Sequence, residues 1–267
     1  MYVLEFLNKN EIEEFIDETG YKVIEYLLRK TAFSQPEVRD ESELSGIQIT
    51  KEFLEDWIAQ AGDLKKIGAG SYPIDVYKEN EYGIDVKFIT TGCDIDGNIT
   101  PKLSNETSLS QNFKTVGSSL DTLFLNEEHE NILNLWSTLL YEKIQKPIRD
   151  LNLKKIYYFV FMRANNKIFL SIALLNPDLI METTVSRFSK TSVYSNGYID
   201  ERYGRVNVYK SKKRMELRLF THHLIEDNKT ILWDFDNFYP DVLSLRTEIK
   251  KNGIKKQALR QFKKYFG

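Results

Sequence analysis

Apolar residues recur at intervals of three and four positions in four parts of the chain, which predicts helices there. Residues 2–30 follow this spacing almost throughout. The segment TKEFLEDWIAQ predicts a helix with Thr50 at its N-cap. Residues 127–146 have the clearest amphipathic pattern, with Trp136 on the apolar face. The C-terminal segment predicts a further helix, interrupted near Gly253.

Other segments have the alternating or continuous apolar patterns of strands. Residues 73–78 and 83–91 flank a short polar turn and predict an antiparallel hairpin. The runs KIYYFVFMRA and KIFLSIALL predict two strands joined by an Asn-Asn turn, and YGRVNVYKSKKRMELRLF predicts a second hairpin. TILWDF adds a strand, whereas residues 31–48 and 92–119 are polar and predict loops. This order predicts an α/β (α+β) fold with a central mixed β-sheet flanked by helices.

Length and composition are those of one globular domain spanning residues 1–267. We expect a helical N-terminal elaboration at 1–49, a core at 50–180, and a basic β region with a C-terminal helix at 181–267. No run of 18 apolar residues predicts a membrane span, and the N-terminus lacks the features of a signal peptide. Cys93 is the single cysteine, which excludes an intrachain disulfide and a cysteine-based zinc site. A cytoplasmic location is therefore expected.

The segment GIDVKFIT places charged side chains in a strand that is otherwise apolar. Four Asp/Glu-x-Lys matches occur in the chain, and only Asp85–Lys87 lies in such a strand. Alternate residues of a strand share a face, so Asp85 and Lys87 point the same way, and the hairpin brings Asp75 near them. Adjacent carboxylates repel each other unless a cation such as Mg²⁺ lies between them, and a nearby lysine can position an attacking water. The pattern favours phosphodiester hydrolysis, and the alternative is a salt bridge at a strand end.

The same residues resemble the signature of the PD-(D/E)XK nuclease superfamily, which includes the type II restriction endonucleases. PID at 73–75 is followed, after nine residues, by DVK at 85–87. A helix precedes the hairpin, and a helix and a strand follow it, so the order of elements agrees over about residues 50–163. The first motif departs from the family pattern because Ile74 separates its proline from its aspartate. The resemblance implies a restriction-endonuclease-like core with an added basic β region.

The resemblance also implies a role for each residue of the motif. Asp75 and Asp85 would bind Mg²⁺, and the Val86 carbonyl would be a further ligand. Lys87 would position the water that attacks phosphorus. Hydrolysis would leave 5′-phosphate and 3′-hydroxyl ends.

The resemblance leaves open which residue completes the site. Glu52 and Glu55 both lie on the helix before the hairpin, and we favour Glu55 because it is closer to the hairpin in sequence. One of them would support the metal or the lysine. Gln111 is a further candidate, with a capping or loop hydrogen bond as the alternative role.

Charge is distributed unevenly along the chain, although the net charge is only −2. Residues 1–56 hold 14 acidic and six basic residues, whereas residues 187–218 hold nine basic and three acidic residues. Residues 246–264 hold eight basic residues and one acidic residue. Tyrosines interleave the basic residues of 187–218, which suits a nucleic acid, and a solvated hairpin is the alternative. The candidate DNA-binding residues are Arg187, Lys190, Asn196, Arg202, Arg205, Lys210, Lys212, Lys213 and Arg214.

Other motifs in the chain are incomplete or missing, which argues against several other kinds of functional site. Asp94, Asp96 and Asn98 alternate as in a calcium loop, but the glycine and glutamate positions of an EF-hand do not match. His222 and His223 are adjacent, and on a strand they would point to opposite faces. The chain has no Gly-rich phosphate loop, no G-x-S-x-G and no H-E-x-x-H, which argues against a P-loop ATPase, an α/β-hydrolase and a zincin.

These features together predict a type II restriction endonuclease that cleaves double-stranded DNA at a specific short sequence, with Mg²⁺ as its cofactor. A palindromic recognition site would require a homodimer of matching symmetry. Two alternatives stay open. The first is a nuclease of the same superfamily that acts in DNA repair, transposition or phage defence. The second is a DNA-binding protein without catalytic activity.

Overall fold

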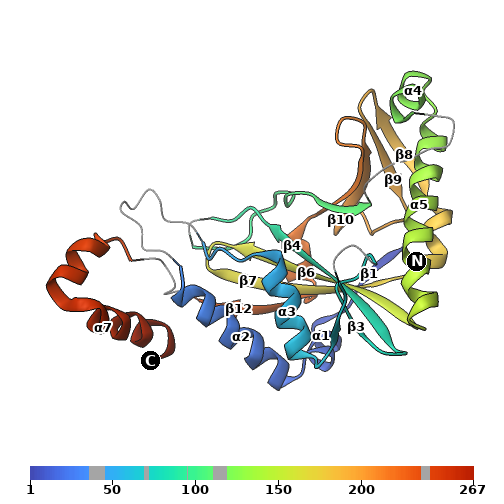
Figure 1. Cartoon of the computed structure of the whole chain (residues 1–267). Helices are drawn as coiled ribbons and strands as arrows, with labels where there is room; N and C mark the ends of the chain where they lie inside the picture. The colour runs from blue at the N-terminus through green and yellow to red at the C-terminus, as the bar shows by residue number, and fades with distance from the viewer. Residues whose placement is uncertain (36–45, 69–71, 95, 111–118, 236–240) are drawn as a thin grey trace.

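The computed structural model describes residues 1–35, 46–68, 72–94, 96–110, 119–235 and 241–267 (Figure 1). They form two β-sheets with helices packed against them. The larger, central sheet has seven strands in the order β1-β7-β6-β4-β3-β2, with β12 also paired to β7. Its strands are β1 (Leu4–Phe6), β2 (Lys65–Lys66), β3 (Val76–Lys78), β4 (Tyr82–Thr90), β6 (Lys155–Ala164), β7 (Lys167–Leu175) and β12 (Ile231–Asp234).

The central sheet is mixed because β4 and β6 run parallel, whereas its other neighbouring strands run antiparallel. Parallel strands need a long crossover connection, and the helix α5 (His129–Asp150) lies in the chain between these two. β6 and β7 form a tight hairpin, in which Asn165 adopts a φ of 52° that asparagine tolerates. In the strand order of the central sheet, β4 and β6 are the two middle strands, and hydrophobic cores cover both of their faces.

Alternate residues of β6 point to opposite faces of the central sheet, and different helices cover each face. Tyr157 and Phe159 belong to the hydrophobic core that includes α1, α2 and α3. Tyr158 and Val160 belong to the core that includes α5. The first three helices are α1 (Lys9–Phe15), α2 (Glu18–Phe33) and α3 (Lys51–Ala61).

A second, five-stranded antiparallel sheet stands beside α5 (Figure 1). Its order is β5-β11-β10-β9-β8. Val206, Val208 and Leu217 are buried in the same core as Trp136 of α5, so the opposite face of this sheet carries the polar residues. The strands are β5 (Thr107–Ser110), β8 (Thr184–Ser189), β9 (Ser192–Asn196), β10 (Gly204–Tyr209) and β11 (Arg214–Leu219). The remaining helices are α4 (Leu120–Leu125), the 3₁₀ helix η2 (Pro177–Glu182), α6 (Thr221–Glu226) and α7 (Leu245–Phe266).

The structure confirms most of the predicted elements, including both hairpins, the long amphipathic helix and the mixed central sheet. Thr50 occupies the N-cap of α3, although its side chain makes no capping hydrogen bond. Gly253 interrupts α7 with a φ of 74°, where glycine avoids the strain of a side chain. Among the described residues, no helix is long and apolar enough to cross a membrane.

Three predictions about the elements are wrong. Residues 4–6 form strand β1 rather than helix, because Leu4 and Phe6 alternate into the core beside β7. The predicted loop 92–119 contains β5, which has few apolar residues and pairs with β11. His222 and His223 lie on helix α6, and their rings are 3.9 Å apart. Within residues 181–267, β12 pairs with β7 of the central sheet.

Candidate active site

The β3–β4 hairpin brings the first motif aspartate to the middle of the second motif. Val76 pairs with Ile84, and the next backbone hydrogen bond runs from the Asp75 N–H to the Ile84 carbonyl, at 2.8 Å. The Val86 N–H donates to Oδ2 of Asp75 at 2.7 Å, so the carboxylate takes the place of a strand neighbour. A buried strand N–H needs an acceptor, and here a side chain of the site supplies it.

Asp85 and Lys87 form an ion pair on the α5 side of the central sheet. Lys87 Nζ lies 2.6 Å from Asp85 Oδ2, and their side chains are only 12% and 9% exposed. The Lys87 ammonium group also lies 5.3 Å from the centre of the Tyr158 ring. Tyr158 is the residue of β6 that pairs with Asp85. Burial raises the pKa of Asp85, and the Asp75 charge adds to this, while Lys87 opposes it. The surroundings of Asp85 therefore disfavour the charged form of its carboxyl group.

Helix α3 adds a second layer of charged groups. Lys51 Nζ lies 3.3 Å from Asp75 Oδ1 and 3.2 Å from Glu55 Oε1. Burial raises the pKa of Glu55, and the nearby Asp75 carboxylate raises it further. Glu52 is exposed to solvent, so of the two glutamates it is Glu55 that lies at the site. The structure thus brings Glu55 to Asp75, although its role stays a prediction.

Two lysines at this site were not singled out in the sequence. Lys51 precedes Glu55 by one helical turn, a spacing that makes the two neighbours on α3. Lys143 lies on α5, and its pKa is lowered by burial and by the positive charges of Lys87 and Lys51. The aspartates of the site oppose that shift, which places Lys143 in the same electrostatic group. Neither lysine could be assigned without knowing how the helices pack.

The groups of this site that could bind a metal ion all offer oxygen atoms, which suit a hard cation such as Mg²⁺. They are the Asp75 and Asp85 carboxylates and the Val86 carbonyl. The N–H and C=O groups of a strand residue point to the same edge, so this carbonyl faces the side on which Asp75 lies. A set of this size leaves positions for water and phosphate oxygens. No group of three or more His, Cys, Asp or Glu residues that could hold a metal ion is found in the described parts of the chain.

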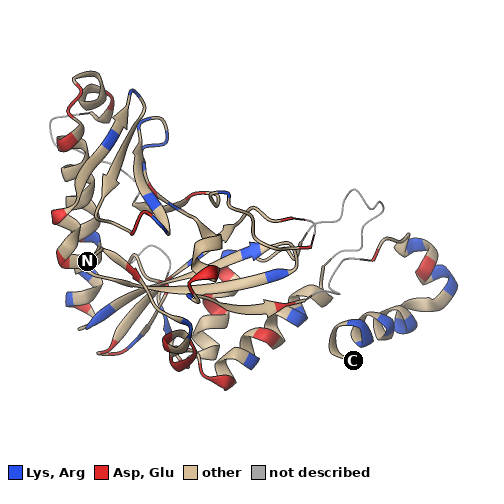
Figure 2. Cartoon of the chain, turned by 180° about the vertical axis from the view of Figure 1, so that it is seen from behind, with Lys and Arg blue, Asp and Glu red and all other residues tan. Residues whose placement is uncertain are grey.

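The predicted DNA-binding residues lie on the second sheet and its turns, and several are neutralised by carboxylates. Lysines and arginines are spread over this sheet and are frequent along α7 (Figure 2). Arg202 Nε lies 2.6 Å from Asp227 Oδ2. Lys210 and Lys213 each face Asp121, at 3.9 and 3.8 Å.

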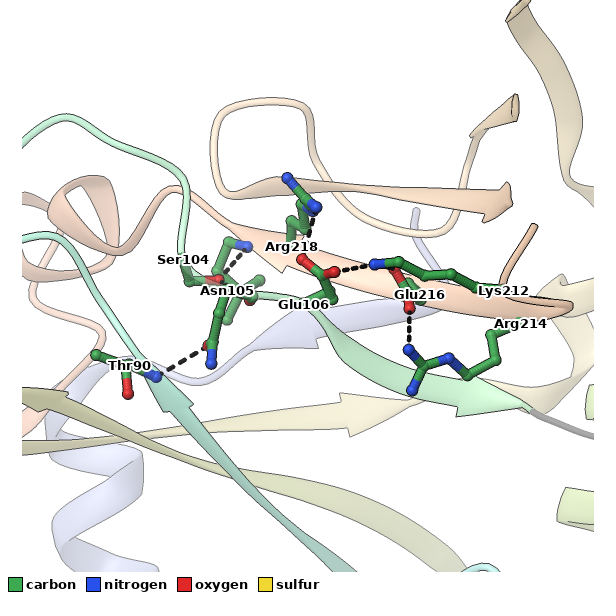
Figure 3. A network of polar contacts seen from close by, with 9 residues as sticks. Thr90, Ser104, Asn105, Glu106, Lys212, Arg214, Glu216 and Arg218 are labelled. Atoms are coloured by element: carbon green, nitrogen blue, oxygen red, sulfur yellow. Dashed lines mark hydrogen bonds and ion pairs between the residues drawn. The ribbon is translucent and has the colours of Figure 1, made fainter. Parts of the chain in front are cut away.

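A network of ion pairs holds further cations of this sheet (Figure 3). Arg214 lies 3.1 Å from the buried Glu216, and Lys212 pairs with both Glu216 and Glu106. Arg218 lies 2.6 Å from the other oxygen of Glu106. By contrast, no ion pair is found among the described residues for Arg187, Lys190 or Arg205.

One candidate of the site, Gln111, lies outside the described residues. Asn196 ends β9, where its side chain accepts a hydrogen bond from the Gly197 N–H at 2.9 Å.

Comparisons with protein-family models, with curated proteins and with solved structures find no match to this chain. What the site does is therefore inferred from its own geometry and chemistry.

Proposed function

We propose that this chain is a Mg²⁺-dependent endonuclease that hydrolyses phosphodiester bonds of double-stranded DNA, of the type II restriction kind. One observation carries the proposal: the Asp75 carboxylate sits on the Val86 N–H, directly beside the buried pair of Asp85 and Lys87. Perturbed carboxylates and lysines gathered at one place are typical of catalytic sites.

The arrangement of elements around the site supports the same proposal. The chain runs α3-β2-β3-β4-β5-α4-α5-β6, and β2, β3, β4 and β6 lie side by side in the order β2-β3-β4-β6. Apart from β5 and α4, this is the succession that the resemblance to the PD-(D/E)XK superfamily implies, with the first motif just before β3 and the second on β4. The parallel pairing of β4 with β6 leaves α5 over the face that carries Asp85 and Lys87.

The residues of the site divide the work of hydrolysis. Asp75, Asp85 and the Val86 carbonyl would hold Mg²⁺, which when bound polarises a phosphate oxygen and neutralises its charge. Lys87, beside Asp85, orients the water for attack on phosphorus in line with the departing 3′-oxygen. The P–O3′ bond breaks as the new P–O bond forms, the 3′-oxygen takes up a proton, and the other end keeps a 5′-phosphate. Lys51 and Lys143 add positive charge near the phosphate.

The test is cleavage of plasmid and mixed-sequence linear DNA by the purified chain with Mg²⁺ or Mn²⁺. Asp75→Ala and Lys87→Ala should each lower the cleavage rate at least about 100-fold, while DNA binding in Ca²⁺ persists. Lys250→Ala is the matched control, because Lys250 belongs to another Asp/Glu-x-Lys match, on the exposed helix α7.

Two results would count against the proposal. A wild-type chain that cuts no DNA with either metal would remove its basis. Variants that cut as fast as the wild type would instead show that the charged residues of β3 and β4 form structural salt bridges. A specific digest pattern on a plasmid of known sequence would separate a restriction enzyme from a nuclease without sequence preference.

A further inference from the structure

Two arginines of the second sheet lie against one tyrosine. Arg187 of β8 has its guanidinium carbon 4.3 Å from the centre of the Tyr194 ring, and that of Arg205 of β10 lies at 5.6 Å. Tyr194 is on β9, between the two strands that carry the arginines. We call these three residues the Arg–Tyr–Arg stack. Packing against the ring restricts the orientation of each planar guanidinium group.

The stack differs from most other cations of the sheet because, within the described parts of the chain, its arginines have no carboxylate partner. Lys212, Arg214 and Arg218 are held by Glu106 and Glu216 (Figure 3). Among the described residues, neither Arg187 nor Arg205 forms an ion pair, and the Arg205 Nε is buried without a hydrogen-bond partner. The positive charges of these two arginines are therefore not neutralised by a carboxylate among the described residues.

A cavity of about 370 Å³ lies at the stack. Arg187, Tyr194 and Arg205 line it together with Ser186, Phe220 and Glu201. The hydroxyl and guanidinium groups of this lining can hydrogen-bond to the edge of a nucleobase. A carboxylate at the same place repels a phosphate group but can accept a hydrogen bond from an amino group of a base.

Asn207 lies next to the stack, on the same face of the second sheet. It is fully buried, faces Tyr194 across the β9–β10 pair, and shares a face with Arg205 two residues before it. Within the described chain, neither its amide oxygen nor its amide nitrogen has a hydrogen-bond partner. Buried polar groups are nearly always paired, and a buried water molecule is one partner that such an amide takes.

We propose that the Arg–Tyr–Arg stack forms a base-reading subsite that recognises guanine in the major groove of DNA. The inference rests on the proposed function, since DNA is the substrate of that reaction. A fixed guanidinium fork matches the O6 and N7 acceptors of guanine, and this bidentate contact discriminates bases. Sheet strands are known to enter the major groove, and this polar sheet face presents both forks from neighbouring positions.

The experiment replaces each arginine by lysine, which keeps the charge and removes the fork. A duplex library with a randomised central segment is incubated with the full chain in Ca²⁺, and the bound fraction is sequenced. Wild type should enrich guanine at fixed positions. Arg187→Lys and Arg205→Lys should each lose that enrichment at one position and bind the preferred duplex about 5- to 150-fold more weakly. Replacing the enriched guanine by 7-deazaguanine should weaken wild type and leave the matching variant unchanged.

Arg29→Lys is the control, because Arg29 lies on α2, outside the second sheet, and is paired with Glu25 at 2.7 Å. It should bind and select like wild type, and thermal unfolding checks that all three variants fold. Retained guanine enrichment in Arg187→Lys and Arg205→Lys would overturn the inference. An equal loss for all sequences would also overturn it, since that result indicates a phosphate contact.

The outcome for cleavage is separate from the outcome for recognition. If wild type selects guanine and the lysine variants do not, the inference holds even when no DNA is cut with Mg²⁺. In that case the proposed nuclease activity fails and the chain is a sequence-specific DNA-binding protein. If DNA is cut but the lysine variants select as wild type does, the nuclease proposal stands and the base-reading subsite fails.

Discussion

Replacing the buried ion pair of β4 by apolar residues should not destabilise the fold. We consider the double variant Asp85→Val with Lys87→Met, because valine suits a strand and methionine resembles lysine in length. The two side chains are 9% and 12% exposed and their charged atoms lie 2.6 Å apart. Removing two charges from water costs several kcal/mol for each ion, and the attraction between them restores only part of it.

The raised pKa of Asp85 sets the direction of the expected change. Burial is its largest cause, and the attraction of Lys87 does not outweigh it. The double variant should therefore have a free energy of unfolding equal to that of wild type, or higher by up to about 3 kcal/mol. Lys87→Met alone should be less stable by about 3 kcal/mol, since it leaves a buried carboxylate without its nearest cation.

Urea unfolding followed by tryptophan fluorescence measures these differences, with slopes compared between variants. The control is the Lys65–Glu79 pair, which joins β2 to the end of β3 and is more than half exposed. Changing both of its members to alanine should leave the midpoint unchanged. A loss of more than about 1 kcal/mol in the double variant of β4 would refute the reasoning, because the pair would then stabilise the fold.

The remaining predictions concern three other places in the fold. Asn207→Val should raise the free energy of unfolding by about 1–2 kcal/mol, measured in urea, because it removes a buried amide that has no partner among the described residues. Burial raises the pKa of Tyr198 from 10.0 to about 12, so the folded state keeps a proton that the unfolded state loses. As the pH rises from 10.0 to about 12, the free energy of unfolding of wild type should therefore fall by about 2–3 kcal/mol more than that of Tyr198→Phe. Gly253→Ala should lower stability by about 1–2 kcal/mol, seen in the thermal midpoint, since its φ is 74°.

Strand alternation was enough to predict that Asp85 and Lys87 share a face. Strand alternation alone could not predict the position of Asp75, because that position depends on the register of the hairpin. Asn80 turns the chain with a φ of 59°, and Lys78 then pairs with Tyr82, which places Asp75 at the Val86 N–H. A register shifted by one residue would have turned the carboxylate to the opposite face.

Contacts between distant elements could not be predicted from the sequence. Lys51 and Lys143 reach the site from two helices on opposite faces of the sheet, so only helix packing identifies them. The basic segment 187–218 raised a related difficulty. Its positive charges could be counted, but their partners Glu106, Asp121 and Asp227 come from elsewhere in the chain. Counting charge therefore overstated how many cations are open to DNA.

The two sheets are joined at the strand that carries the candidate site. β4 ends at Thr90, whose N–H donates to Oδ1 of Asn105 and whose carbonyl accepts from the Asn105 N–H. The next residue, Glu106, binds Lys212 and Arg218 of the second sheet (Figure 3). Moving one sheet against the other would break these bonds together with those of Ser104 to Leu219. If the second sheet binds DNA as proposed, these bonds hold that DNA in a fixed relation to Asp85 and Lys87, which the proposed cleavage at a defined position requires.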